Sequence, residues 1–201
     1  MIYSHDNDDD DDDVDESSGD QPSLAGLGRL ARLGQKVAWF SKVGTPLRAV
    51  ERDFAQDYLD ALGFPDAHIA GVADWNEAES CAQNPDWNSD WWEAEEQLSA
   101  GLLVEAQERL SEDELVMALT HVTAKISDVV HAAAEAAAAR AGITDEGLIQ
   151  AAAGAATQVC YQVALVLAAE AEESHPFAIK FRLFESGRWP LGVIGGTFNL
   201  F

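Results

Sequence analysis

The residues best suited to metal chemistry lie in one stretch predicted to be helical, HVTAKISDVVHAAAE. A turn of about 100° per residue brings four side chains onto one helical face: His121, Asp128, His131 and Glu135. Helical bundles build carboxylate–histidine metal sites from stripes of this kind. However, no second helix offers a matching Glu/His set, and Lys125 falls near the same face. We therefore interpret the stripe as a solvated helix face and keep a metal-dependent helical enzyme as the alternative hypothesis.

Other catalytic and cofactor patterns are missing from the sequence. Neither the nucleophile pattern G-x-S-x-G nor a P-loop occurs, and GVIGG lacks the third glycine and the strand and helix of a dinucleotide site. The two cysteines, Cys81 and Cys160, lie far apart, whereas zinc and redox motifs place them two to four positions apart. We predict no cofactor, name no catalytic or metal-binding residue, and lean toward a protein that is not an enzyme.

An unusual mixture of tryptophan and acid occurs at residues 86–96, DWNSDWWEAEE. On a helix, Trp87 and Trp91 share the apolar stripe, and Trp92 lies at its edge or outside it. The acids Asp90, Glu93 and Glu96 point away from that stripe, and acids near a helix N-terminus also complement its positive end. Ordinary amphipathicity therefore explains most of this composition. Trp92 is the best candidate for an exposed tryptophan.

Tryptophan is enriched at the residues that dominate binding energy in protein interfaces, and an acidic rim attracts a basic partner. The predicted partner-binding residues are therefore Trp87, Trp91 and Trp92, their acidic neighbours Asp90, Glu93 and Glu96, and Trp189 beside Pro190 in the C-terminal segment. The competing interpretation is that the tryptophans fill the core.

The net charge of −24 disfavours nucleic acid as a partner, because nucleic-acid binders use basic surface to displace phosphate counterions. The charge is uneven along the chain. Residues 1–20 carry ten acids and no Lys or Arg, residues 21–50 carry five bases and no acid, and residues 51–175 carry 25 acids against four bases. We therefore predict an acidic interaction or accessory protein, inhibitor-like or immunity-like, that binds a basic protein surface. The oligomeric state is left open.

The segment that could contact a membrane is the basic amphipathic stretch at 24–40, although it more often folds back onto an acidic body. Peripheral membrane association through this stretch is the second alternative. The apolar run 148–169 contains three glutamines and many alanines, so we interpret it as a buried core helix rather than a membrane span. We expect a cytoplasmic protein, with no integral membrane association.

The elements that must position these residues follow from capping and periodicity. A disordered acidic tail is expected over 1–23, followed by a single globular domain over 24–201. Helices are predicted at about 46–62, 75–83, 86–110, 112–140 and 145–173, and strands at about 177–184, 188–194 and 197–201. The alanine-rich parts of the last two helices predict a central antiparallel helix hairpin. The predicted fold class is α+β, mostly α: a helical bundle around this hairpin with a small C-terminal antiparallel meander.

Overall fold

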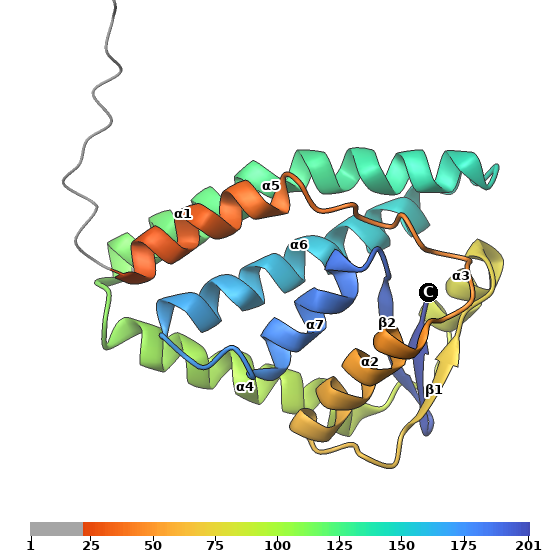
Figure 1. The fold of residues 1–201 in the computed structure, drawn as a ribbon, viewed down its shortest axis with the longest axis horizontal. Helices are drawn as coiled ribbons and strands as arrows, with labels where there is room; N and C mark the ends of the chain where they lie inside the picture. The colour runs from red at the N-terminus through yellow and green to blue at the C-terminus, as the bar shows by residue number, and fades with distance from the viewer. Residues whose placement is uncertain (1–21) are drawn as a thin grey trace, which may run out of the picture.

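The computed structural model describes residues 22–201, which form seven helices and one three-stranded sheet (Figure 1). The helices are α1 (Pro22–Gly34), α2 (Ala49–Leu62), α3 (Trp75–Ala82), α4 (Ser89–Gln107), α5 (Glu112–Arg140), α6 (Glu146–Ala168) and α7 (Pro176–Glu185). The strands are β1 (His68–Gly71), β2 (Pro190–Ile194) and β3 (Thr197–Leu200). The predicted fold class, a mostly helical α+β domain, is confirmed. The predicted acidic tail lies outside the described residues up to position 21, and α1 begins at Pro22.

The helices α5 and α6 form the predicted alanine-rich hairpin, in which α6 lies in the middle of the helical body and α5 lies along its outer edge (Figure 1). Ser111 begins α5 with a capping box, in which its side chain accepts from the Glu114 amide and the Glu114 carboxylate accepts from the Ser111 amide. Asp145 caps α6 by accepting from the Leu148 amide at 2.7 Å. Both helices place fully buried alanines in one core, among them Ala134 and Ala152. Small side chains let the two backbones approach closely.

Helix α6 is the one helix in the described part of the chain that is long and apolar enough to cross a membrane. In this fold, 61% of its most apolar window is buried, and it packs against α1, α4, α5 and α7. This agrees with the core helix predicted at 148–169. The helix predicted at 145–173 ends earlier, at Ala168, and Glu170 then takes a left-handed conformation with φ 51°.

The basic N-terminal segment folds back onto the body of the protein. Leu27, Leu30 and Ala31 of α1 are buried against α5 and α6. The chain then buries Trp39 and Phe40 beneath α7, where both rings meet Phe184 edge-on. Most of the apolar face that peripheral membrane binding would need is therefore already covered.

The strand predicted at 177–184 is wrong, because this segment is helix α7 (Pro176–Glu185). His175 caps it and Pro176 occupies its first turn, where proline fits best. The alternation of large apolar residues suggested a strand with one buried face. Instead seven of its ten residues are buried, so Phe177 enters one core cluster while Ile179 enters the other. Only Arg182 and Glu185 are exposed, which leaves a polar face too narrow to identify the helix in the sequence.

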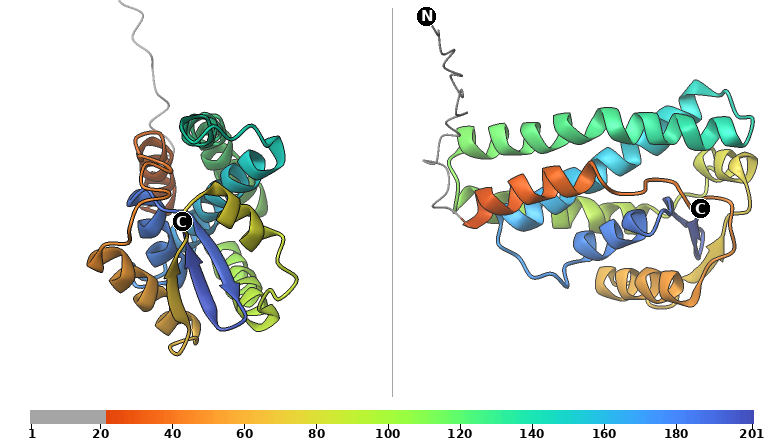
Figure 2. Two further views of the ribbon diagram at one scale, coloured as in Figure 1. Left: turned by 90° about the vertical axis from the view of Figure 1, so that its right-hand side faces the viewer. Right: turned by 45° about the horizontal axis from the view of Figure 1, so that its top comes forward.

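The sheet lies at one end of the helical body and has the strand order β1-β3-β2 (Figure 2). The predicted hairpin of β2 and β3 is antiparallel, with Gly195 in the left-handed region at its turn. Pro190 begins β2 on the edge of the sheet, as its missing N–H requires. The third strand, β1, was missed and pairs with β3 in parallel, so the predicted all-antiparallel meander is wrong.

A buried arginine fastens the segment before α2 to the C-terminal hairpin. Arg188 is fully buried and donates to the carbonyls of Lys42 and Thr45, each at 2.7 Å, and to Pro46 at 2.8 Å. It also donates to the buried Glu51 carboxylate at 2.8 Å. Burial alone would raise the pKa of Glu51, but hydrogen bonds from Arg188 and from the Arg48 backbone and side chain outweigh burial and lower it.

Candidate binding site

The N-terminus of α4 positions Trp87, Trp91 and Trp92, which we call the tryptophan cluster. The Asn88 side chain caps this helix by accepting from the Trp91 amide at 2.9 Å, so α4 begins at Ser89 rather than at 86. Trp87 therefore precedes the helix and does not share its stripe. Its backbone instead forms an isolated antiparallel bridge with Ile194 at the end of β2. The cluster is thus held from two sides, by the helix cap and by the sheet.

The predicted tryptophans divide into exposed and buried members. Trp92 is 57% exposed and Trp87 is 38% exposed, whereas Trp91 is 4% exposed. Trp189, a predicted partner-binding residue that would have to be exposed, is buried at 3% and packs against Phe40. That expectation is wrong because Trp189 pairs through its backbone with Phe201, which draws the indole into the core.

The acids of α4 also divide. Asp90, Glu93 and Glu96 are exposed, as the helical pattern predicted, whereas Glu95 is buried. The buried Glu95 Oε1 accepts from Lys180 Nζ of α7 at 2.5 Å and from the Tyr58 hydroxyl of α2. The ion pair joins α4 to α7, and the hydrogen bond from Tyr58 joins α2 to both.

Tyr58 extends the buried network toward the tryptophans. Its hydroxyl accepts from the Trp91 Nε1 donor at 3.2 Å while it donates to Glu95. Burial, followed by the nearby Glu95 charge, holds the pKa of Tyr58 well above its usual value, so the phenol stays neutral and remains a donor. Lys180 Nζ lies 5.6 Å from the centre of the Trp91 ring, within cation–π range. The network fixes the orientation of Trp91.

A pocket of about 470 Å³ opens beside this network, between α4, α6, α7 and β2; we call it the tryptophan pocket. It is lined by Trp87, Trp91, Trp92 and Trp189, together with Glu95, Glu96 and Lys180. The α6 side contributes small residues and two glutamines, Gln158 and Gln162. Its volume falls in the range of small-ligand sites, and its walls combine aromatic surface with a few polar groups, which is the usual composition of such sites.

One buried polar atom in this wall lacks a partner. Gln162 is 3% exposed, and its Oε1 atom accepts no hydrogen bond from the described residues. A buried acceptor without a donor costs free energy, so such atoms usually have an explanation in the function or the solvent structure of a protein. Gln162 is therefore a polar group in the pocket wall whose acceptor is left without a donor by the described residues.

Gly192 allows the tryptophans to approach strand β2 closely. It has φ +110°, and a Cβ atom there would lie 2.6 Å from Trp87 Cζ3 and 3.0 Å from Trp91 Cη2. Glycine is thus required both by the backbone conformation and by the two indoles. The pocket wall depends on this contact.

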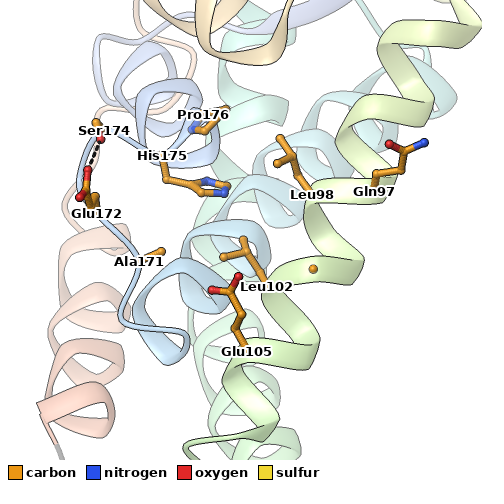
Figure 3. Close-up of a pocket in the computed structure, with 10 residues that line it drawn as sticks. Gln97, Leu98, Leu102, Glu105, Ala171, Glu172, Ser174, His175 and Pro176 are labelled. Carbon is orange, nitrogen blue, oxygen red and sulfur yellow. Dashed lines mark hydrogen bonds between the residues drawn. The ribbon is translucent and has the colours of Figure 1, made fainter.

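A second pocket of about 570 Å³ lies between α4 and the segment before α7 (Figure 3). In Figure 3 the imidazole of His175 points toward Leu98 and Leu102, with Glu105 nearby on α4. The His175 Nδ1 atom accepts from the Phe177 amide at 3.2 Å, so it caps α7. Burial lowers the pKa of His175, although the negative charge of Glu105 opposes this shift. The ring has a structural role, which makes this pocket the weaker candidate.

The face of α5 that the alternative hypothesis assigns to a metal carries His121, Asp128, His131 and Glu135. Within residues 22–201, no three His, Cys, Asp or Glu side chains are placed to hold a metal ion. His131 Nε2 lies 3.3 Å from Glu135 Oε1, and both side chains are about half exposed. His121 and Asp128 are exposed on the same helix. These contacts describe a solvated helix face with one local pair.

The buried members of the site could not be predicted from local pattern. Glu95 and Lys180 are 85 positions apart, and Lys180 falls in the segment 177–184 that the sequence predicts as a strand. The signal that was available is Gln162, a polar residue inside an apolar helix.

Comparisons with known proteins add nothing to these assignments: no family model, no curated protein and no solved structure matches the chain.

Proposed function

We propose that this protein is a non-enzymatic binding protein that docks a basic surface of a partner protein onto the N-terminal half of α4. The observation that carries this proposal is the exposed Trp92, which stands beside the tryptophan pocket and among exposed acids. An exposed indole beside a concave aromatic pocket is the arrangement of an interface anchor. A water-exposed tryptophan has no role in stabilising a core.

Charge favours a basic partner. Glu96 lies one turn after Trp92 on α4, Asp90 and Glu93 are exposed on the same turns, and residues 51–175 carry a large acidic excess. Such a field raises the rate of encounter with a basic protein and excludes acidic ones. The binding should therefore weaken as salt is added, because exposed charges are screened over about 8 Å at physiological ionic strength.

The experiment is affinity capture from a lysate of the source cell with matched variants. Trp92→Ala removes the proposed anchor. Met117→Ala is the control, because the side chain of Met117 on α5 is apolar and 65% exposed, against 57% for Trp92. A partner bound at this site is captured by the wild type and by Met117→Ala but not by Trp92→Ala. The captured protein is then purified and its dissociation constant measured by calorimetry at two salt concentrations.

Two results would contradict the proposal. One is a partner that Trp92→Ala captures as well as the wild type does, which would place the interface elsewhere. The other is an affinity that is unchanged by salt and by Glu96→Lys. That result would show that the partner does not bind through a basic surface.

A further inference from the structure

The geometry of the tryptophan pocket points to the kind of side chain it receives: we infer that it binds a guanidinium group, supplied by an arginine of the partner. This inference rests on the proposed function for the source of the arginine. The chemistry of the pocket, however, can be tested without any partner.

The charges that line the pocket leave room for one cation. Its ionisable lining residues are Glu95, Glu96 and Lys180, which sum to one net negative charge. Lys180 and Glu95 already neutralise each other at 2.5 Å. The exposed Glu96 is therefore the carboxylate that remains for a ligand. A cationic ligand restores neutrality, whereas an anionic one would add to the excess.

The indoles favour a planar cation. Guanidinium groups stack on aromatic faces, and tryptophan gives the strongest cation–π attraction of the three aromatic residues. Lys180 lies within that range of Trp91 from inside the protein, so the cluster already holds one cation against an indole. Trp87 and Trp92 keep exposed ring surface, which a ligand entering from solvent can cover.

The unpartnered acceptor selects a ligand with several donors. Gln162 Oε1 is buried in the pocket wall and accepts nothing from residues 22–201. Arginine carries five N–H donors and no acceptor, so a guanidinium that stacks on an indole still has donors left for Gln162 and for Glu96. A quaternary ammonium could stack but would leave Gln162 without a donor.

The test uses two blocked amino acids as probes, Nα-acetyl-arginine methylamide and its citrulline counterpart, which has nearly the same shape and no charge. Binding is followed through the indole N–H signals in NMR spectra of the whole protein. The expected result is saturable binding of the arginine probe, at least about tenfold tighter than the citrulline probe, because hydrogen bonds with a charged group are worth about 1.5–3 kcal/mol. Equal binding of both probes, or no binding of the arginine probe, would overturn the inference.

Variants locate the binding. Gln162→Leu should weaken the arginine probe at least about tenfold, whereas Gln150→Leu, which changes an exposed glutamine on the same helix, should leave it unchanged. Glu96 is exposed, so Glu96→Gln should keep the fold intact. This variant provides a second test if Gln162→Leu fails to fold. Arginine binding that survives both Gln162→Leu and Glu96→Gln would show a different site and overturn the inference.

The two proposals can fail separately. If a partner is captured through Trp92 while the arginine probe does not bind, the docking function stands and the guanidinium assignment falls. If the arginine probe binds in the pocket and no Trp92-dependent partner is found, the assignment stands and the proposed docking function falls.

Discussion

Replacing Lys180 by methionine removes one half of the buried ion pair while keeping most of the side-chain volume. The two charged groups are 2.5 Å apart, and their side chains are 10% and 6% exposed. Removing one partner of such a pair costs about 3–5 kcal/mol, because the other charge is left buried. The Tyr58 hydroxyl still donates to Glu95, so we expect a loss near the lower limit, about 3 kcal/mol.

That loss converts to a melting temperature lower by about 6–12 °C, since 1 kcal/mol shifts Tm by about 2–4 °C in domains of about 150–250 residues. The assay is urea unfolding at pH 7 together with calorimetry on the same samples. The matched control is Lys125→Met on the exposed face of α5, for which we expect a change within about 0.5 kcal/mol.

A second variant separates charge from packing. Adding Glu95→Gln to Lys180→Met removes the stranded carboxylate, so the double variant should return to within about 1 kcal/mol of the wild type. A loss below about 1 kcal/mol in Lys180→Met, or no recovery in the double variant, would refute the view that Lys180 neutralises a buried Glu95.

Three further predictions follow from individual contacts. Gly192→Ala should destabilise the fold by more than about 1 kcal/mol and shift the tryptophan emission, because its Cβ would meet Trp87 Cζ3 at 2.6 Å; urea unfolding followed by fluorescence measures both. The pKa of His175 is lowered from 6.5, so the folded state favours the neutral ring. The contribution of this ring to stability is therefore complete above pH 6.5 and is lost as the pH falls below 6.5. Between pH 7.5 and 5.5, the melting temperature of His175→Asn should fall less steeply than that of the wild type. Burial raises the pKa of Cys160 to about 12, so a thiol reagent at pH 8 should leave this residue unmodified in the native protein and label it after unfolding, as peptide mass spectrometry would show.

The sequence predicts the helices well where their ends carry local signals. Ser111 with Glu114 marks the start of α5, and Asp74 marks the start of α3, because a cap is a contact between near neighbours. Strand β1 has four residues and no alternation, and its existence depends on β3. Helix α7 is predicted as a strand because burial of seven of its ten residues leaves only a narrow polar face.

The candidate site divides in the same way. The exposure of Trp92 follows from its angle around α4, which the sequence defines. The burial of Trp189 and of Glu95 depends on contacts from distant segments, the backbone of Phe201 and the ammonium group of Lys180. A pattern read over a few turns contains no information on such contacts.

The central position of β3 has a consequence for the order of folding. The α5–α6 hairpin consists of contacts between neighbouring helices, so it can form early. The sheet joins β1 to β3, and Arg188 joins the same late segment to carbonyls before α2, so both must wait for the closure of a long loop. We expect refolding to show an early helical phase and a slower phase in which Trp189 becomes buried. Until that slower phase is complete, the tryptophan pocket lacks its β2 wall, and binding competence should appear last.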